Sequence, residues 1–103
     1  MQETSEIEEL LVCLMEECGE IVQAVSKILR HTSDSKNPDK INSDTNFNHL
    51  MKEIGDFDCV VGKLVSAGYY NHDLVSESFS KKEINLTKWL HGELLFRNKK
   101  KGI

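Results

Sequence analysis

The sequence predicts an all-α protein, folded as a small antiparallel helical bundle. Two observations lead to this prediction: the 103 residues contain a single proline, and almost no segment alternates apolar and polar residues as a half-buried strand does. Apolar residues instead recur every three or four positions over long runs, which indicates amphipathic helices. A chain of this length has room for one hydrophobic core, so residues 1–103 are expected to form a single domain.

The first helix is predicted from about Glu3 to His31. Thr4 or Ser5 can cap its start, and the helix dipole favours the glutamates that follow. Its apolar stripe consists of Ile7, Leu10, Leu11, Leu14, Cys18, Ile21, Val22, Val25, Ile28 and Leu29. These positions step by three and four, so the stripe is expected to face the core.

A polar loop is predicted over residues 32–44, because this stretch is rich in Ser, Asn, Asp and Lys and holds the only proline, Pro38. The second helix then runs from about Thr45 to Ala67, and Gly68 suits its end. Its apolar stripe consists of Phe47, Leu50, Met51, Ile54, Phe57, Val61, Leu64 and Val65.

A third helical stretch opens near Asn71 and continues to Leu90. Its pattern leaves open whether this is one helix or two helices broken near residues 80–82. Trp89 is interpreted as a core residue of this stretch. Asp58 falls within the apolar stripe of the second helix, so it is expected to meet a partner across a subunit interface or to lie at the rim of the core.

Composition and charge exclude several classes of partner. The net charge of −4 gives no case for a nucleic-acid surface, and the basic residues 97–103 are interpreted as a solvated tail. No segment approaches the ~20 apolar residues that cross a bilayer, and the acidic start lacks the positive charge of a secretion signal. Three cysteines do not make a disulfide framework. We therefore expect a cytoplasmic protein with neither nucleic acid nor membrane as a partner.

A second stripe on each long helix carries a pair of acidic residues. Glu17 and Glu20 on the first helix, and Glu53 and Asp56 on the second, are each three positions apart and stand on consecutive turns of one face. If the two helices pack together, the four carboxylates converge. Like charges at close range repel, and a hard divalent cation removes that cost. Oxygen-only ligation suits Mg²⁺ or Mn²⁺ rather than zinc, and Mg²⁺ bridges to substrate phosphates.

Spacing alone supports a metal site and two solvated helix faces about equally, because glutamates are common on exposed helix surfaces. Two features favour the metal site. Each acidic pair lies in mid-helix beside an apolar stripe, and the small residues Gly19, Ala24 and Gly55 flank the pairs. Glycine within a helix costs about 1 kcal/mol relative to alanine, which a close helix approach or room for a ligand would offset.

Two segments resemble the signatures of a known family. The stretch from Leu14 to Ala24 (LMEECGEIVQA), with KILRH after it, and the stretch from Leu50 to Phe57 (LMKEIGDF) resemble the MazG-like family of all-α nucleoside triphosphate pyrophosphohydrolases. The family pattern is Glu-Glu-x-x-Glu on one helix and Glu-x-x-Asp on the next. The resemblance covers residues 7–67, and the last third of the chain shares only the helical pattern. The gap between Glu20 and Glu53 is longer than in compact members of the family.

The resemblance implies a set of metal ligands and catalytic residues. The Mg²⁺ ligands would be Glu17, Glu20, Glu53 and Asp56. The metal would bind the triphosphate and activate a water for attack between the α and β phosphoryl groups. Glu17 would serve in catalysis as well as ligation. Glu16 also belongs to the motif but points about 100° away from Glu17, so it would approach a second metal, position the water, or be solvated.

Four polar residues are candidates for contacts with the nucleotide: Lys27, Arg30, Asn46 and Lys81. Lys27 and Arg30 follow the acidic turns. A cation there can contact the phosphates of a nucleotide, or it can form an ordinary surface ion pair with an acidic residue three or four positions away. Asn46 resembles an asparagine that precedes the second motif in the family, and helix capping explains it equally well. Lys81 matches loosely the late lysines that reach phosphate in that family, and a solvated face is the competing interpretation.

The resulting hypothesis is a Mg²⁺-dependent enzyme that hydrolyses nucleoside triphosphates to the monophosphate and pyrophosphate, for sanitation of the nucleotide pool. The alternatives are a non-catalytic helical interaction module and a related hydrolase of phosphoribosyl-ATP or of dUTP and dCTP. The first helix is apolar or functional on more than half its circumference. We therefore expect a homodimer or homotetramer that completes the core.

Overall fold

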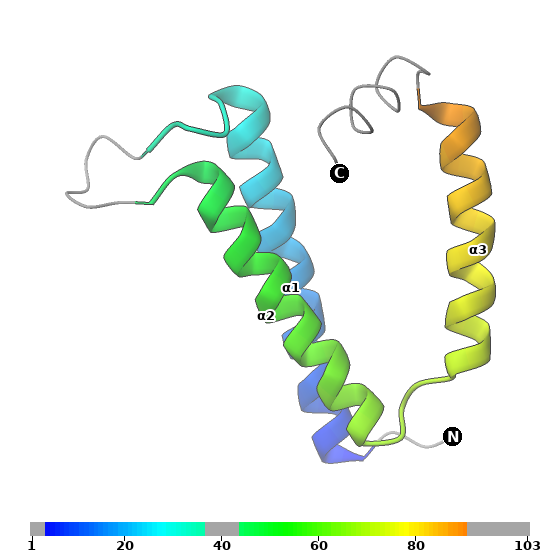
Figure 1. The fold of residues 1–103 in the computed structure, drawn as a ribbon. Helices are drawn as coiled ribbons and strands as arrows, with labels where there is room; N and C mark the ends of the chain where they lie inside the picture. Colours follow the sequence, from blue (N-terminus) through cyan, green and yellow to red (C-terminus); the bar gives the residue numbers. More distant parts are fainter. Residues whose placement is uncertain (1–3, 37–43, 91–103) are drawn as a thin grey trace. The chain divides into compact units, whose positions relative to one another are not determined.

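The computed structural model describes residues 4–36 and 44–90, and this part of the chain contains three α-helices and no strand (Figure 1). The contacts between residues divide the chain into two compact units, Met1–Tyr70 and Asn71–Ile103. The all-α class predicted from the apolar spacing is therefore confirmed. The predicted tail, residues 97–103, and the central part of the predicted loop, with Pro38, lie outside the described residues.

Helix α1 spans Ser5–Arg30. Thr4 is its N-cap, and the Thr4 hydroxyl accepts a hydrogen bond of 3.2 Å from the backbone N–H of Ile7. Glutamates occupy the first turn and Lys27 with Arg30 the last, so charges of both signs complement the helix dipole. The bounds agree with the predicted helix to within two residues.

Helix α2 spans Asn46–Ser66, and its cap is Thr45, whose hydroxyl accepts a hydrogen bond from the backbone N–H of Asn48. Its C-terminal end is a Schellman motif. The N–H of Gly68 bonds to the carbonyl of Val65, and the N–H of Tyr69 bonds to the carbonyl of Leu64. Gly68 has a φ of +78°, a conformation that costs little only for glycine, which confirms its predicted place at the helix end.

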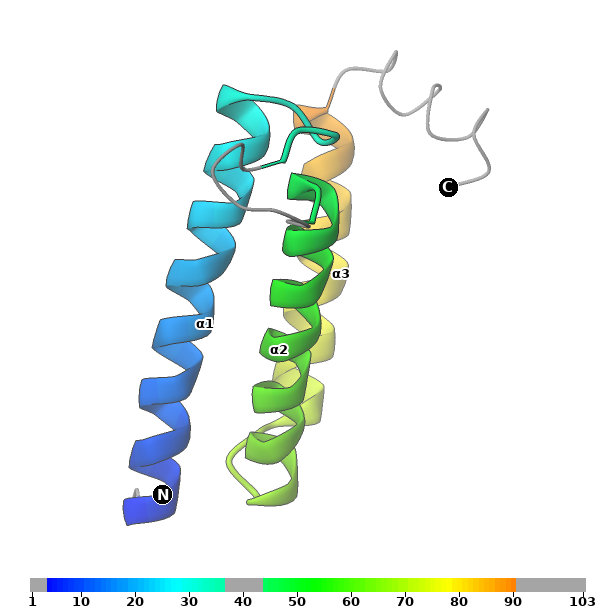
Figure 2. The same ribbon diagram turned by 90° about the vertical axis from the view of Figure 1, so that its left-hand side faces the viewer.

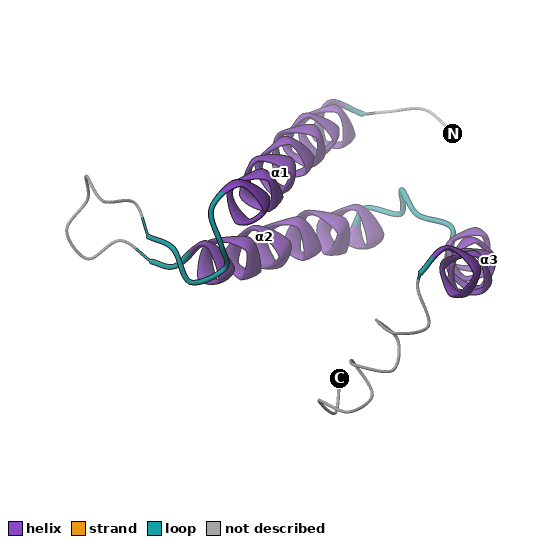
Figure 3. Cartoon of the chain, turned by 90° about the horizontal axis from the view of Figure 1, so that it is seen from above, coloured by secondary structure: helices purple, strands orange, loops and turns teal. Residues whose placement is uncertain are grey.

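Helices α1 and α2 lie side by side as an antiparallel hairpin, an arrangement visible from two directions in Figures 2 and 3. The described parts of the loop between them are held together. Lys36 pairs with Thr45 in an antiparallel bridge, and the Nδ2 of Asn46 donates a 3.0 Å hydrogen bond to the carbonyl of Thr32. These links fix the start of α2 against the end of α1.

The hairpin buries few apolar side chains. Among the described residues the buried apolar ones are Ile7, Ala24 and Leu64, and Ala24 is fully covered. Much of both predicted stripes is exposed, including Val22 and Leu29 at 68% and 81%. The predicted stripes are therefore wider than the face that the two helices cover for each other. Asp58 is exposed, so its charge is solvated in this chain.

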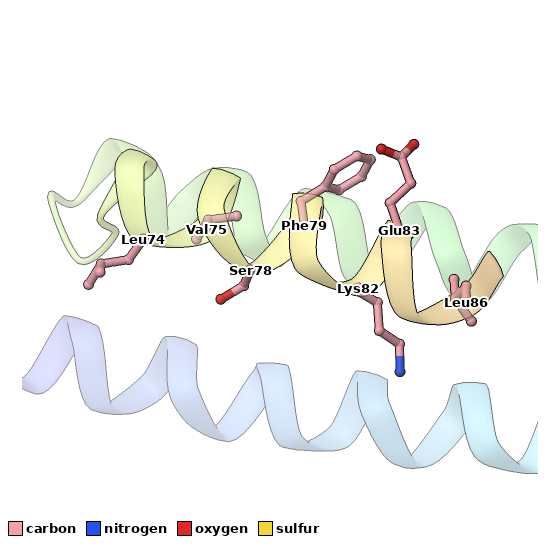
Figure 4. A pocket seen from close by; sticks show the side chains of 7 residues that line it. All are labelled: Leu74, Val75, Ser78, Phe79, Lys82, Glu83 and Leu86. Carbon is pink, nitrogen blue, oxygen red and sulfur yellow. The ribbon is translucent and has the colours of Figure 1, made fainter. Parts of the chain in front are cut away.

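Helix α3 spans His72–Trp89 as one unbroken helix, which answers the question left open by the sequence. Asn71 caps it, and its side-chain oxygen accepts a 3.0 Å hydrogen bond from the backbone N–H of Leu74. One face, drawn in Figure 4, presents Leu74, Val75, Ser78, Phe79, Lys82, Glu83 and Leu86. Trp89 is 83% exposed, so its predicted place in a core is wrong for the described part of the chain.

None of the described helices combines the length and the apolar composition needed to span a membrane.

Candidate metal centre

The four predicted carboxylates converge on one site between α1 and α2. Glu17 and Glu20 come from consecutive turns of α1, and Glu53 and Asp56 from consecutive turns of α2. One carboxylate oxygen from each residue can be chosen so that all four lie within 4.8 Å of one another. Helical spacing of three residues and the antiparallel pairing of the two helices are sufficient to produce this arrangement.

Burial is uneven across the cluster. Glu53 is 3% exposed, Glu17 and Asp56 are half-buried, and Glu20 is exposed. One oxygen of Glu17 and one of Glu53, both Oε2, are buried without a hydrogen-bond partner. A buried carboxylate oxygen that lacks a partner is costly. These two atoms therefore mark a place where a ligand would remove an existing penalty.

The interaction between Glu20 and Glu53 shifts their pKa values in opposite directions. A side-chain hydrogen bond with Glu53, together with the negative charges of Glu53 and Glu17, raises the pKa of Glu20 above its ordinary value of 4.5. The same hydrogen bond lowers the pKa of Glu53, against the opposing effect of its burial. The raised pKa of Glu20 therefore reflects the crowding of negative charge within the cluster.

Two basic side chains also reach the cluster. His49 Nε2 lies 3.2 Å from Glu53 Oε1. Lys52 Nζ lies 2.8 Å from Asp56 Oδ2 and 3.5 Å from Glu53 Oε1, and the bond to Asp56 raises the pKa of Lys52. Neither residue was predicted from the sequence to have a role in the site. The signal available was their spacing, since each stands four residues before a cluster carboxylate on one helix face.

The donor set suits a hard divalent cation. All four groups are carboxylates, which are ligands that hard metal ions prefer, and Glu20 is exposed while Asp56 is half-buried. The unpartnered oxygens of Glu17 and Glu53 provide the independent indication that these groups fit a cation. Exposed acidic residues alone would not support this interpretation, because they are common on helix surfaces.

The other predicted site residues lie outside this cluster. Glu16 and Lys27 are exposed on α1, and the Nε of Arg30 donates a 3.4 Å hydrogen bond to the carbonyl of Ser26 one turn earlier. Lys81 pairs with Glu77 at 3.0 Å on α3.

Asn46 does not cap α2, because Thr45 holds that position and the Asn46 amide bonds to the loop. The suggested capping role is therefore wrong, and a contact between Asn46 and the nucleotide stays a prediction.

Of the two predicted reasons for glycines near the acidic pairs, close helix approach and room for a ligand, the structure contradicts the first. A Cβ added to Gly19 or Gly55 would meet no atom within 4 Å, so the helices do not approach closely at either glycine. Ala24, by contrast, is fully covered, so α1 is closely packed at this small residue. Close helix approach is therefore wrong at both glycines, and room for a ligand stays a prediction.

Comparisons of the chain with family models, with curated proteins and with solved structures found no match. The assignment of this site therefore depends on its own geometry and on the motifs in the sequence.

Proposed function

We propose that the chain is a divalent-metal-dependent nucleoside triphosphate pyrophosphohydrolase, which releases a nucleoside monophosphate and pyrophosphate. One observation carries the proposal: four carboxylates from two helices converge, and two of their oxygens are buried without a partner. The resemblance of the two acidic motifs to the MazG-like family supplies the reaction type. The interaction-module alternative leaves the two unpartnered oxygens unexplained.

The proposed ligands of Mg²⁺ are Glu17, Glu20, Glu53 and Asp56. A bound Mg²⁺ would supply charge neutralisation for the triphosphate and a lowered pKa for a bound water. The chain itself would fix the ligands: Glu53 is held by burial and by His49, while Asp56 and Glu20 face solvent, where a nucleotide can arrive. Lys27, Arg30, Asn46 and Lys81 remain candidates for contacts with the nucleotide, and Glu16 for positioning the water.

The test is an assay of a panel of ribo- and deoxyribonucleoside triphosphates, with phosphoribosyl-ATP included, in the presence of Mg²⁺ or of EDTA. Chromatography separates the nucleoside monophosphate expected here from the diphosphate that an ordinary phosphatase leaves. We expect monophosphate and pyrophosphate in equal amounts, and no turnover in EDTA. The preferred member of the panel identifies the substrate class.

Two neighbouring residues provide a matched pair of variants. Asp56→Asn removes a proposed ligand, and Asp58→Asn makes the same chemical change two residues further along α2, at an exposed carboxylate outside the cluster. We expect Asp56→Asn to lower kcat/KM by at least about a hundredfold, because a ligand contributes more than the outer-shell partners whose loss costs 10–100-fold. Asp58→Asn should retain wild-type turnover. Equal activity of both variants, or no turnover of any nucleotide, would contradict the proposal.

A further inference from the structure

Lys52 lies on α2 beside the carboxylate cluster and contacts two of its members. It stands next to Glu53 in sequence and four residues before Asp56, and its ammonium group contacts both carboxylates, at 3.5 Å and 2.8 Å. These two residues are the α2 half of the proposed metal centre. The side chain of Lys52 is 65% exposed, so Lys52 lies on the solvent side of the cluster.

Charge explains why a cation is held there. Four carboxylates with oxygens within 4.8 Å of one another repel strongly. Among the described residues, the basic side chains that contact the cluster are His49 and Lys52. Both contact carboxylates of α2. Lysine is a compact point charge on a flexible four-carbon stem, so it can reach two carboxylates at once without a fixed geometry.

A divalent cation held by Glu53 and Asp56 would lie close to the ammonium group that already contacts both carboxylates. A Mg²⁺ bound to Asp56 at about 2.1 Å would lie within a few ångströms of the present Nζ position, where two positive charges repel. Because most of the Lys52 side chain is exposed, its ammonium group can move into solvent without disturbing buried residues.

We propose that Lys52 is a placeholder cation, which neutralises the Glu53 and Asp56 side of the centre in the metal-free protein and is displaced when a divalent cation binds. This inference rests on the proposed metal centre. It makes metal binding an exchange of one cation for another, so the lysine stabilises the empty site and weakens metal affinity. Lys52 is thereby a positioning residue that sets the metal concentration at which the site fills.

The experiment is a titration of the full chain with Mn²⁺, followed by the electron paramagnetic resonance signal of the free ion, without nucleotide and at about 0.1 M ionic strength. Lys52→Met removes the charge and keeps the length of the side chain. Lys52→Gln provides a second neutral variant, and Lys52→Arg keeps the charge. Lys63→Met is the matched control, since it removes the same charge about two turns beyond Asp56 on α2.

We expect both neutral variants to bind Mn²⁺ about fivefold more tightly than the wild type, because a positive charge is removed roughly 5 Å from the ion. Lys52→Arg should bind as the wild type does, and Lys63→Met should differ by less than about twofold at a distance of one Debye length. The increase in Mn²⁺ affinity of the neutral variants should be smaller in 0.5 M salt, because salt screens the charge of Lys52. A role of Lys52 in folding alone would not raise metal affinity.

Two results overturn the inference, and they are distinguishable. If the wild type binds Mn²⁺ and Asp56→Asn abolishes binding, but the neutral Lys52 variants bind equally or more weakly, Lys52 is not a placeholder and the metal centre stands. If the wild type shows no saturable binding that depends on Asp56, the metal centre itself fails, and this inference fails with it.

Discussion

Among single residues, Glu53 combines burial with an incomplete set of hydrogen-bond partners. Its side chain is almost fully buried, yet one of its oxygens has no partner, and the other is approached by both His49 and Lys52. Burial of a charge is tolerated when the charge is paired, whereas a buried oxygen without a partner destabilises the fold. A divalent cation bound to that oxygen would remove this cost.

The raised pKa of Glu20 predicts an unusual dependence of stability on pH in the metal-free protein. Between 4.5 and its raised pKa, folded Glu20 holds a proton that the unfolded chain has released, so its contribution to stability falls as the pH rises through this range. The pKa of Glu53 is lowered, so its effect on stability has the opposite sign. The stability that ionised Glu53 contributes is lost as the pH falls below 4.5.

Thermal unfolding of the wild type and of Glu20→Gln, measured in EDTA from pH 4 to pH 8, checks this prediction. We expect the melting temperature of Glu20→Gln to be equal or higher at pH 7, with a flatter decline above pH 4.5. Saturating Mg²⁺ should stabilise the wild type and have less effect on the variant. Parallel pH profiles of the melting temperature for the two proteins would show that titration of Glu20 does not affect stability.

At the scale of the helices, local sequence predicted the elements well. Thr4 and Gly68 mark ends that depend on nearest neighbours along the chain, and the structure confirms both. The continuity of α3 was not predictable, because residues 80–82 are polar and contain no glycine or proline, so their pattern fits a helix or a break equally.

The acidic pairs were predictable because a spacing of three places carboxylates on one face. The contacts of Lys52 and His49 were not predictable, because a long or rotatable side chain chooses its partner from the tertiary surroundings. The choice between close helix approach and open space at Gly19 and Gly55 could not be made from the sequence, because only the packed hairpin shows that no helix approaches them.

The open space beside these two glycines gives a prediction for α1 and α2. Gly19→Ala and Gly55→Ala should each stabilise the protein by about 1 kcal/mol, because alanine is the better helix former and its methyl group meets no atom. Gly68→Ala should destabilise it by roughly 1–2 kcal/mol, since Gly68 has a positive φ. Urea unfolding of the three variants measures these changes. A loss of stability in Gly19→Ala or Gly55→Ala would indicate that this face is packed in an assembly.

At the scale of the whole molecule, the hairpin covers only part of its apolar surface. The predicted homodimer or homotetramer follows from this exposure, and it stays a prediction. Val22 and Leu29 are seven residues apart on α1, so they share one face, and both are largely exposed. We expect the chain to associate at micromolar concentrations, and the double variant Val22→Lys, Leu29→Lys to weaken that association by at least about tenfold.

Sedimentation equilibrium of the wild type and the double variant measures the change in assembly. Val12→Lys is a control for an added charge at another exposed position on α1. A wild type that remains monomeric at tens of micromolar would contradict the prediction, and the metal centre would then be a property of the single hairpin.

The proposed binding of a divalent cation by the four carboxylates of α1 and α2 can be seen in crystals of the full chain grown with MnCl₂. Diffraction is recorded at an X-ray energy where manganese scatters anomalously. We expect an anomalous peak at about 2.2 Å from oxygens of Glu17, Glu20, Glu53 and Asp56, with the ammonium group of Lys52 displaced from Asp56. Four side chains spread into solvent, with no peak between them, would show that the cluster is not a metal centre.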